Sequence, residues 1–130
     1  MKQEDKELLL KDLCARLPYG VKMNHIADDE CSPKTLIGIA KDMITLQGPG
    51  GYECIPVEHY KPYLFPMSSM TEEQKEEYDS ICAMSGFDMS ELDADRLMTF
   101  FYKNHIDCHD LIPKGLADDA TGLNIYDIGR

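Results

Sequence analysis

The sequence predicts an α+β protein with an N-terminal helix, a small antiparallel sheet or SH3-like barrel, and a C-terminal helical half. Three observations carry this prediction. Apolar residues recur at helical spacing before Pro18, short β-rich runs separated by turn residues follow, and helical periodicity returns after Pro66. With 130 residues the chain has the length of one domain, so we expect a single domain over 1–130. Its expected parts are a helix (1–17), a β-rich region (19–66), a helical region (69–120) and a tail (121–130).

The first helix is predicted from an apolar stripe that follows the i, i+3, i+4, i+7 rule: Leu10, Leu13, Cys14 and Leu17. Acidic residues lie in its first turns and Arg16 lies near its end, which is the arrangement that the helix dipole favours. Pro18 cannot continue a helix, so the helix is expected to end at about residue 17.

Short runs with the composition of strands fill the region between residues 19 and 66. They are GVKM (20–23), KTLIGIA (34–40), KDMITLQ (41–47) and YECIPV (52–57). The GPGG sequence at 48–51 predicts a hairpin turn, and it is not a phosphate-binding loop because Tyr52 and Glu53 stand where Lys and Ser or Thr would be needed. So few short strands indicate a curled sheet or a small SH3-like barrel, in which Pro56 and Pro62 limit the last strand.

Ser69 and Glu72 match a capping box, which would begin a helix with Tyr78, Ile81 and Cys82 on its apolar face. A second helix is expected around 97–102, and Leu123, Ile125 and Tyr126 of the tail are available to cover an edge. The residues expected to form much of the core are Tyr19, Leu36, Ile37, Ile39, Ile44, Leu46, Ile55, Tyr63, Leu64, Ile81, Leu97, Phe100 and Phe101.

The charge of the chain is uneven and excludes some classes of function. The formal net charge is −11, and residues 67–130 hold fourteen acidic against five basic residues. Nucleic-acid and anionic membrane surfaces attract clustered Lys and Arg, so direct binding to either is not expected. The N-terminus lacks the pattern of a secretory signal, and the five cysteines form no CxxC pair. These features predict a cytoplasmic location.

His105, Cys108 and His109 lie within five positions of one another and are the residues to weigh for chemistry. If they continue a helix, Cys108 and His109 point about 100° apart, so all three cannot easily bind one ion. Structural zinc sites usually have two short ligand pairs, and adjacency alone does not make a Cys–His catalytic pair. We therefore expect one of these polar side chains to cap the carbonyls at the helix end while Cys108 packs inside, with no cofactor and no catalysis. The alternative is a metal-binding protein that uses this cluster.

The second candidate is an acidic helix face, made of Glu72, Glu73, Glu76, Glu77 and Asp79. Such faces are often merely solvated, but a strong excess of one charge attracts partners of the opposite charge. The leading hypothesis is a non-catalytic interaction protein that binds a basic surface of another protein. A sharper version is nucleic-acid mimicry, in which this face and residues 88–95 imitate a track of phosphates.

Three stretches resemble a set of small uncharacterised proteins encoded by phages and mobile elements of gut bacteria of the Bacteroides group. They are DLCARLPYGVK (12–22), KPYLFPMSSMTEEQ (61–74) and LIPKGLADDATGLNIY (111–126). The resemblance implies a short cytoplasmic accessory protein of a mobile-element gene set. It implies no catalytic residues.

Overall fold

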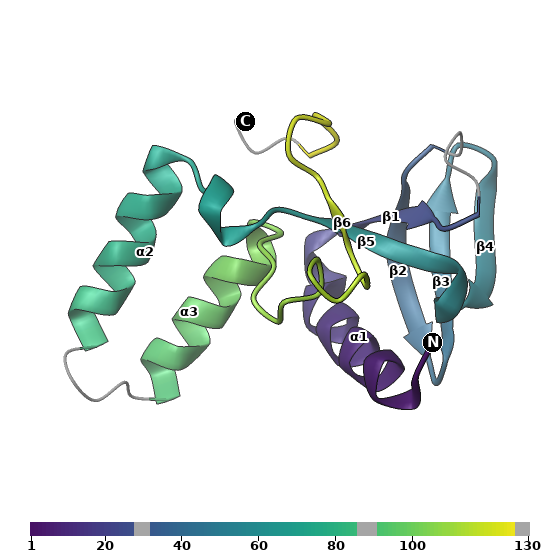
Figure 1. Cartoon of the computed structure of the whole chain (residues 1–130), viewed down its shortest axis with the longest axis horizontal. Coiled ribbons are helices and arrows are strands. Elements are labelled where there is room, and N and C mark those ends of the chain that lie inside the picture. Colours follow the sequence, from purple (N-terminus) through teal and green to yellow (C-terminus); the bar gives the residue numbers. More distant parts are fainter. Residues whose placement is uncertain (28–31, 86–90, 127–130) are drawn as a thin grey trace.

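The computed structural model describes residues 1–27, 32–85 and 91–126, and these form an α+β fold as predicted (Figure 1). Helix α1 (Gln3–Arg16) comes first and is followed by the strands, and two helices form an arm on the far side of α1. The strands are β1 (Lys22–His25), β2 (Lys34–Ala40), β3 (Met43–Gly48), β4 (Gly51–Pro56), β5 (Tyr60–Leu64) and β6 (Asp118–Asp119). The arm consists of α2 (Glu72–Ser85) and α3 (Glu91–Lys103). Short 3-10 turns are η1 (Leu17–Tyr19), η2 (Val57–His59) and η3 (Met67–Ser69).

The strands form one six-stranded sheet in the order β4-β3-β2-β1-β5-β6. Every neighbouring pair is antiparallel except β5 and β6. Among the described residues β4 and β6 are the edges, so the sheet is not a closed barrel. It is nevertheless strongly curled, because the Tyr60 hydroxyl on β5 donates a hydrogen bond to Glu53 on β4 at 3.0 Å, across three intervening strands. The curled open sheet confirms the first of the two predicted forms.

Strand prediction succeeds where turn residues separate the runs and fails after Pro56. β2 covers the predicted run 34–40, and Gly48 pairs with Gly51 at the end of the β3–β4 hairpin, as the GPGG sequence indicates. β5 was not predicted because Pro62 lowers the β propensity of its segment. Pro62 is tolerated in β5 because the pairing of β5 with β6 involves only Tyr63 and Leu64.

The main hydrophobic core lies between α1 and the sheet, and its α1 side differs from the prediction. The buried apolar residues of α1 are Leu9 and Leu13, whereas Cys14 is exposed. The buried stripe is Leu9, Asp12, Leu13 and Arg16, which obeys the same spacing rule one residue earlier. The predicted stripe was right at Leu13, half-buried at Leu10 and Leu17, and wrong at Cys14. It was offset because the rule was applied to apolar residues only, and two of the four buried positions carry charge.

The expected core residues fall into three groups. Those that are buried as predicted are Leu36, Ile44, Leu46, Leu64, Phe100 and Phe101. Those that are half-buried are Ile39, Ile55, Tyr63, Ile81 and Leu97. Tyr19 and Ile37 were wrong, with 37% and 41% of their surface exposed. Ile37 lies beside a register shift between Leu36 and Gly38, where alternation along the strand breaks.

The capping box of α2 is formed by Thr71 and Gln74, and the prediction of Ser69 and Glu72 was wrong. The Gln74 N–H donates to the Thr71 hydroxyl at 3.2 Å, and the Thr71 N–H donates to the Gln74 side-chain oxygen at 3.0 Å. Ser69 lies in η3, and its hydroxyl donates to the carbonyl of Pro66. Both pairs have the spacing of a capping box. Ser69 cannot cap α2 because it belongs to the 3-10 turn η3, so the helix begins two residues later.

The region 104–120 was expected to be helical, but α3 ends at Lys103 and this region contains turns and β6. His105 has φ +57°, a left-handed conformation that cannot continue the helix. The segment then pairs with the chain beyond β5, since Phe65 N–H donates to His105 O and Asp107 N–H donates to Phe65 O. A second hydrophobic cluster, with Phe100, Phe101 and Ile106 buried, joins the arm to this segment.

The tail is anchored by Tyr126, which packs with Phe65 and Ala120. Its hydroxyl accepts a hydrogen bond from the Lys22 N–H at 2.7 Å and donates to the Tyr63 carbonyl at 2.8 Å. One phenol thus bridges β1 and β5. Of the three predicted edge-covering residues, Leu123 is exposed, while Ile125 packs beside Tyr126. Residues 127–130 lie outside the described part.

Replacing Tyr126 by Phe should lower the free energy of unfolding by about 1–3 kcal/mol, because two part-buried backbone groups each lose a hydrogen bond. Urea titration measures this. Tyr52, with 73% of its surface exposed, is the matched control, and Tyr52→Phe should change stability by less than about 0.5 kcal/mol. Equal effects of the two substitutions would contradict the bridge.

Candidate functional site

The structure separates His105 from Cys108 and His109. The His105 ring is buried and stacks on Tyr126, with ring centroids 3.8 Å apart and planes 14° from parallel. Its Nδ1 atom has no hydrogen-bond partner among the described residues. Burial, assisted by the charges of Arg16 and Lys22, lowers the pKa of His105 to about 4, so the ring is neutral at neutral pH.

Cys108 and His109 instead meet Asp12, which is distant in sequence. His109 Nδ1 lies 2.8 Å from Asp12 Oδ2 and 3.7 Å from Cys108 Sγ. The donor atoms of these three residues all lie within 4.8 Å of one another. Cys108 packs against the cluster of Phe100, Phe101 and Ile106, as expected, and His109 has a polar partner that the sequence did not indicate. The side chain that bonds back to the last turn of α3 is that of Asn104, which donates to the Phe100 carbonyl at 2.9 Å.

A buried ion pair holds Asp12 in place. Arg16 and Asp12 are both fully buried, and Arg16 Nε donates to Asp12 Oδ1 at 2.5 Å. Arg16 Nη2 also donates to the carbonyl of Ile106 at 2.7 Å, and its guanidinium carbon lies 5.2 Å from the centre of the Tyr102 ring. The pair thereby joins α1 to the end of α3 and the segment that follows it.

Sequence reasoning missed Asp12 and Arg16, although a signal was present. The two opposite charges are four residues apart, on the stripe that contains Leu9 and Leu13. On a surface helix this spacing describes an ordinary exposed pair, worth a few tenths of a kcal/mol. Only the tertiary contact with Ile106 makes the pair a buried one.

The cluster is not arranged as a nucleophile with its base. A Cys–His–Asp relay uses the two different ring nitrogens of His, whereas here Nδ1 alone faces both Asp12 and Cys108. Burial raises the pKa of Cys108 to about 11, because its effect exceeds the opposing effect of Arg16. The thiol is therefore protonated at neutral pH. This geometry supports polar linkage or metal ligation in place of covalent catalysis.

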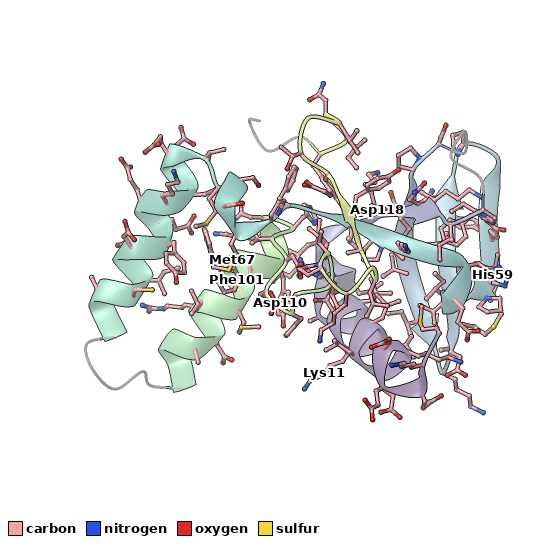
Figure 2. All side chains as sticks on the ribbon, in the orientation of Figure 1. Lys11, His59, Met67, Phe101, Asp110 and Asp118 are labelled. Carbon is pink, nitrogen blue, oxygen red and sulfur yellow. The ribbon has the colours of Figure 1, made fainter. Side chains whose placement is uncertain are left out.

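The second candidate, the acidic face, is exposed throughout. Its five residues are Glu72, Glu73, Glu76, Glu77 and Asp79, all on α2, which holds Lys75 as its one basic residue. Lys75 lies 3.7 Å from Glu72, and Lys103 of α3 pairs with Glu77 at 2.8 Å. Oxygen-tipped side chains project from α2 on the side away from α3 (Figure 2).

An open groove of about 320 Å³ runs between the two helices of the arm. Ile81 and the nearly buried Phe100 lie at its base, and two acidic and two basic side chains surround them: Glu77, Asp95, Arg96 and Lys103. The groove and the acidic face share Glu77, so a partner on one is close to the other.

No protein-family model, curated protein or solved structure matches this chain. No helix in the described part of the chain has the length and apolar character needed to cross a membrane. The fold and the two candidate sites therefore carry the functional argument by themselves.

Replacing one member of the buried ion pair should lower the free energy of unfolding more than replacing both. Asp12→Leu and Arg16→Met should each lower the free energy of unfolding by about 3–5 kcal/mol, because each leaves a buried charge without its partner. The double variant should lower the free energy of unfolding by much less than the sum of the two single effects. The part that remains comes from the Ile106 carbonyl, which loses its hydrogen bond to Arg16. A urea double-mutant cycle measures the coupling, with the exposed Lys75→Met as control. Additive effects would contradict a buried pair.

Lowering the pH from 6.5 to 4 should destabilise the protein through His105. The unfolded chain binds a proton at His105 near pH 6.5 but the folded chain does so only near pH 4, so stability falls as the pH falls between these values. The shift corresponds to about 3 kcal/mol. His105→Asn accepts the left-handed backbone and should remove this part of the slope. The exposed His59→Asn is the control, and an unchanged slope in His105→Asn would refute the assignment.

Proposed function

We propose that the protein is a non-catalytic interaction factor that binds a basic partner through the acidic face of α2. The observation that carries the proposal is the exposure of all five carboxylates on the outermost helix of the arm (Figure 1). An exposed carboxylate face on a projecting helix speeds the encounter with a positively charged surface and sets its orientation.

The apolar groove beside this face supports docking that is more than electrostatic. The half-buried Ile81 offers nonpolar contact next to Glu77 and Asp95. A basic residue can lay its methylene chain on such a surface while its charged end meets a carboxylate. Apolar contact of this kind contributes affinity that salt does not screen.

The spacing of the carboxylates supports nucleic-acid mimicry as the sharper form of the proposal. With a rise of about 1.5 Å per residue, the five acidic groups from Glu72 to Asp79 follow one another about every 2.6 Å along the helix axis. Duplex DNA carries a charge about every 1.7 Å of its axis, and each single strand about every 3.4 Å. The face thus approximates the charge density of a nucleic acid over one short stretch.

We place this factor in the cytoplasm, as an accessory protein of a phage or mobile element. The resemblance of segments 12–22, 61–74 and 111–126 to proteins of Bacteroides-group phages supports that setting. The number and spacing of the cysteines, which favour a reducing compartment, support the location.

Pull-down from a Bacteroides-group lysate tests the proposal, with bound protein measured as the salt concentration rises. Glu72→Gln/Glu76→Gln should reduce capture of the basic partner several-fold at low salt, because two carboxylates of the face are lost. Glu4→Gln/Glu7→Gln on α1 is the matched control, since it removes two exposed carboxylates from another helix and should leave capture unchanged.

Two results would contradict the proposal. One is equal loss of the partner in both double variants, which would indicate a response to net charge alone. The other is a partner whose capture does not depend on salt. Duplex DNA should compete with the protein for the captured partner, and simultaneous binding of both would exclude mimicry while leaving the interaction itself intact.

A further inference from the structure

The Asp12, Cys108 and His109 donor atoms already occupy a volume of the size of a metal coordination sphere. All lie within 4.8 Å of one another, with 2.8 Å from His109 Nδ1 to Asp12 Oδ2 and 3.7 Å from Nδ1 to Cys108 Sγ. Zinc binds carboxylate, imidazole and thiolate donors at about 2.0–2.3 Å, so two donors of a tetrahedral site lie roughly 3.3–3.8 Å apart. Side-chain shifts on the order of 1 Å would bring the three atoms to these separations.

The backbone after α3 allows neighbouring residues to face the same point. On a helix Cys108 and His109 would diverge by about 100°, but α3 ends at Lys103 and the segment is irregular. Asp107 fixes its course, since its carboxylate accepts hydrogen bonds from the N–H groups of His109, Leu111 and Ile112 at 3.3, 2.9 and 2.9 Å. The two donors are thus held toward Asp12 by a bonded loop.

Arg16 orients the carboxylate in the manner of an outer-shell residue. Its Nε donates to Asp12 Oδ1 and its Nη2 donates to Oδ2 at 3.2 Å, and Oδ2 also lies 2.8 Å from His109 Nδ1. The positive charge of Arg16 opposes the binding of a second cation. Its Nη2 atom, however, lies 3.8 Å from Cys108 Sγ, where the same charge favours the thiolate. The carboxylates of Asp12 and Asp107 together with a Cys108 thiolate balance the charges of Arg16 and one divalent ion.

We propose that Asp12, Cys108 and His109 bind one divalent, late first-row transition-metal ion, with zinc as the best chemical fit and water as the fourth ligand. The mixed S, N and O donor set suits zinc, and three protein ligands leave one position open. The His109 side chain is 25% exposed, so solvent reaches the site. The ion would strengthen the link between α1 and the segment after α3.

Binding requires two proton movements, which balance the step. The Cys108 thiol loses its proton to solvent as the sulfur–metal bond forms. The His109 ring donates through Nδ1 to Asp12 in the metal-free arrangement, so its proton transfers to Nε2 and Nδ1 becomes the ligand atom. No oxidant or reductant is involved.

Cobalt(II) titration of the full-length chain without a histidine tag tests the site. We expect one Co²⁺ per chain, a near-ultraviolet thiolate-to-cobalt absorption band, and visible bands of a four-coordinate ion. Cys108→Ser should abolish the thiolate band, and His109→Ala should weaken binding roughly tenfold or more. The exposed Cys54→Ser and His59→Ala are the controls, and both should bind as the wild-type chain does.

Absence of the thiolate band in the wild-type chain at millimolar Co²⁺ would overturn the proposal, whatever the variants do. Persistence of the band in a folded Cys108→Ser variant would overturn it too, since another cysteine would then be the ligand. Glu72→Gln/Glu76→Gln should bind Co²⁺ normally, and loss of binding there would assign the ion to the acidic face. The metal site and the partner surface can thus fail independently.

Discussion

The buried ion pair of Arg16 and Asp12 is the interaction on which the rest of the structure depends. Removing two charges from water is costly, and this pair offsets that cost with further contacts to Ile106, Tyr102 and His109. These contacts come from the end of α3 and the segment beyond it, so one guanidinium links the first helix of the chain to residues about ninety positions later. A pair of nonpolar residues would fill the space, but it would not specify which carbonyl lies against α1.

This link positions both candidate sites. It fixes the point at which α3 leaves the body of the protein, and therefore where α2 and its carboxylates project. It also places Asp12 against Cys108 and His109, which the chain alone would leave as two neighbouring polar residues. The acidic face and the cluster of Asp12, Cys108 and His109 differ in chemistry, but both depend on the same anchoring of the arm.

The parts of the fold that local rules determine could be predicted from the sequence. The run 34–40 and the GPGG turn carry their own strand and hairpin signals, and the acidic face follows from helical spacing in α2. The failures arise where tertiary contacts choose between equivalent local patterns. Leu9 or Leu10 could begin the buried stripe of α1, and Ser69 or Thr71 could cap α2, by the same spacing. The convergence of Asp12 with His109 has no local signal, because it depends on a left-handed residue, His105, at the end of α3.

Nuclear magnetic resonance of the Arg16 guanidinium tests the central claim most directly. If Arg16 is held between Asp12 and Ile106, its Nε–H proton will exchange slowly with water at neutral pH and show nuclear Overhauser contacts to Ile106 and Cys108. A guanidinium that exchanges as fast as that of the exposed Arg96, without these contacts, would contradict the account.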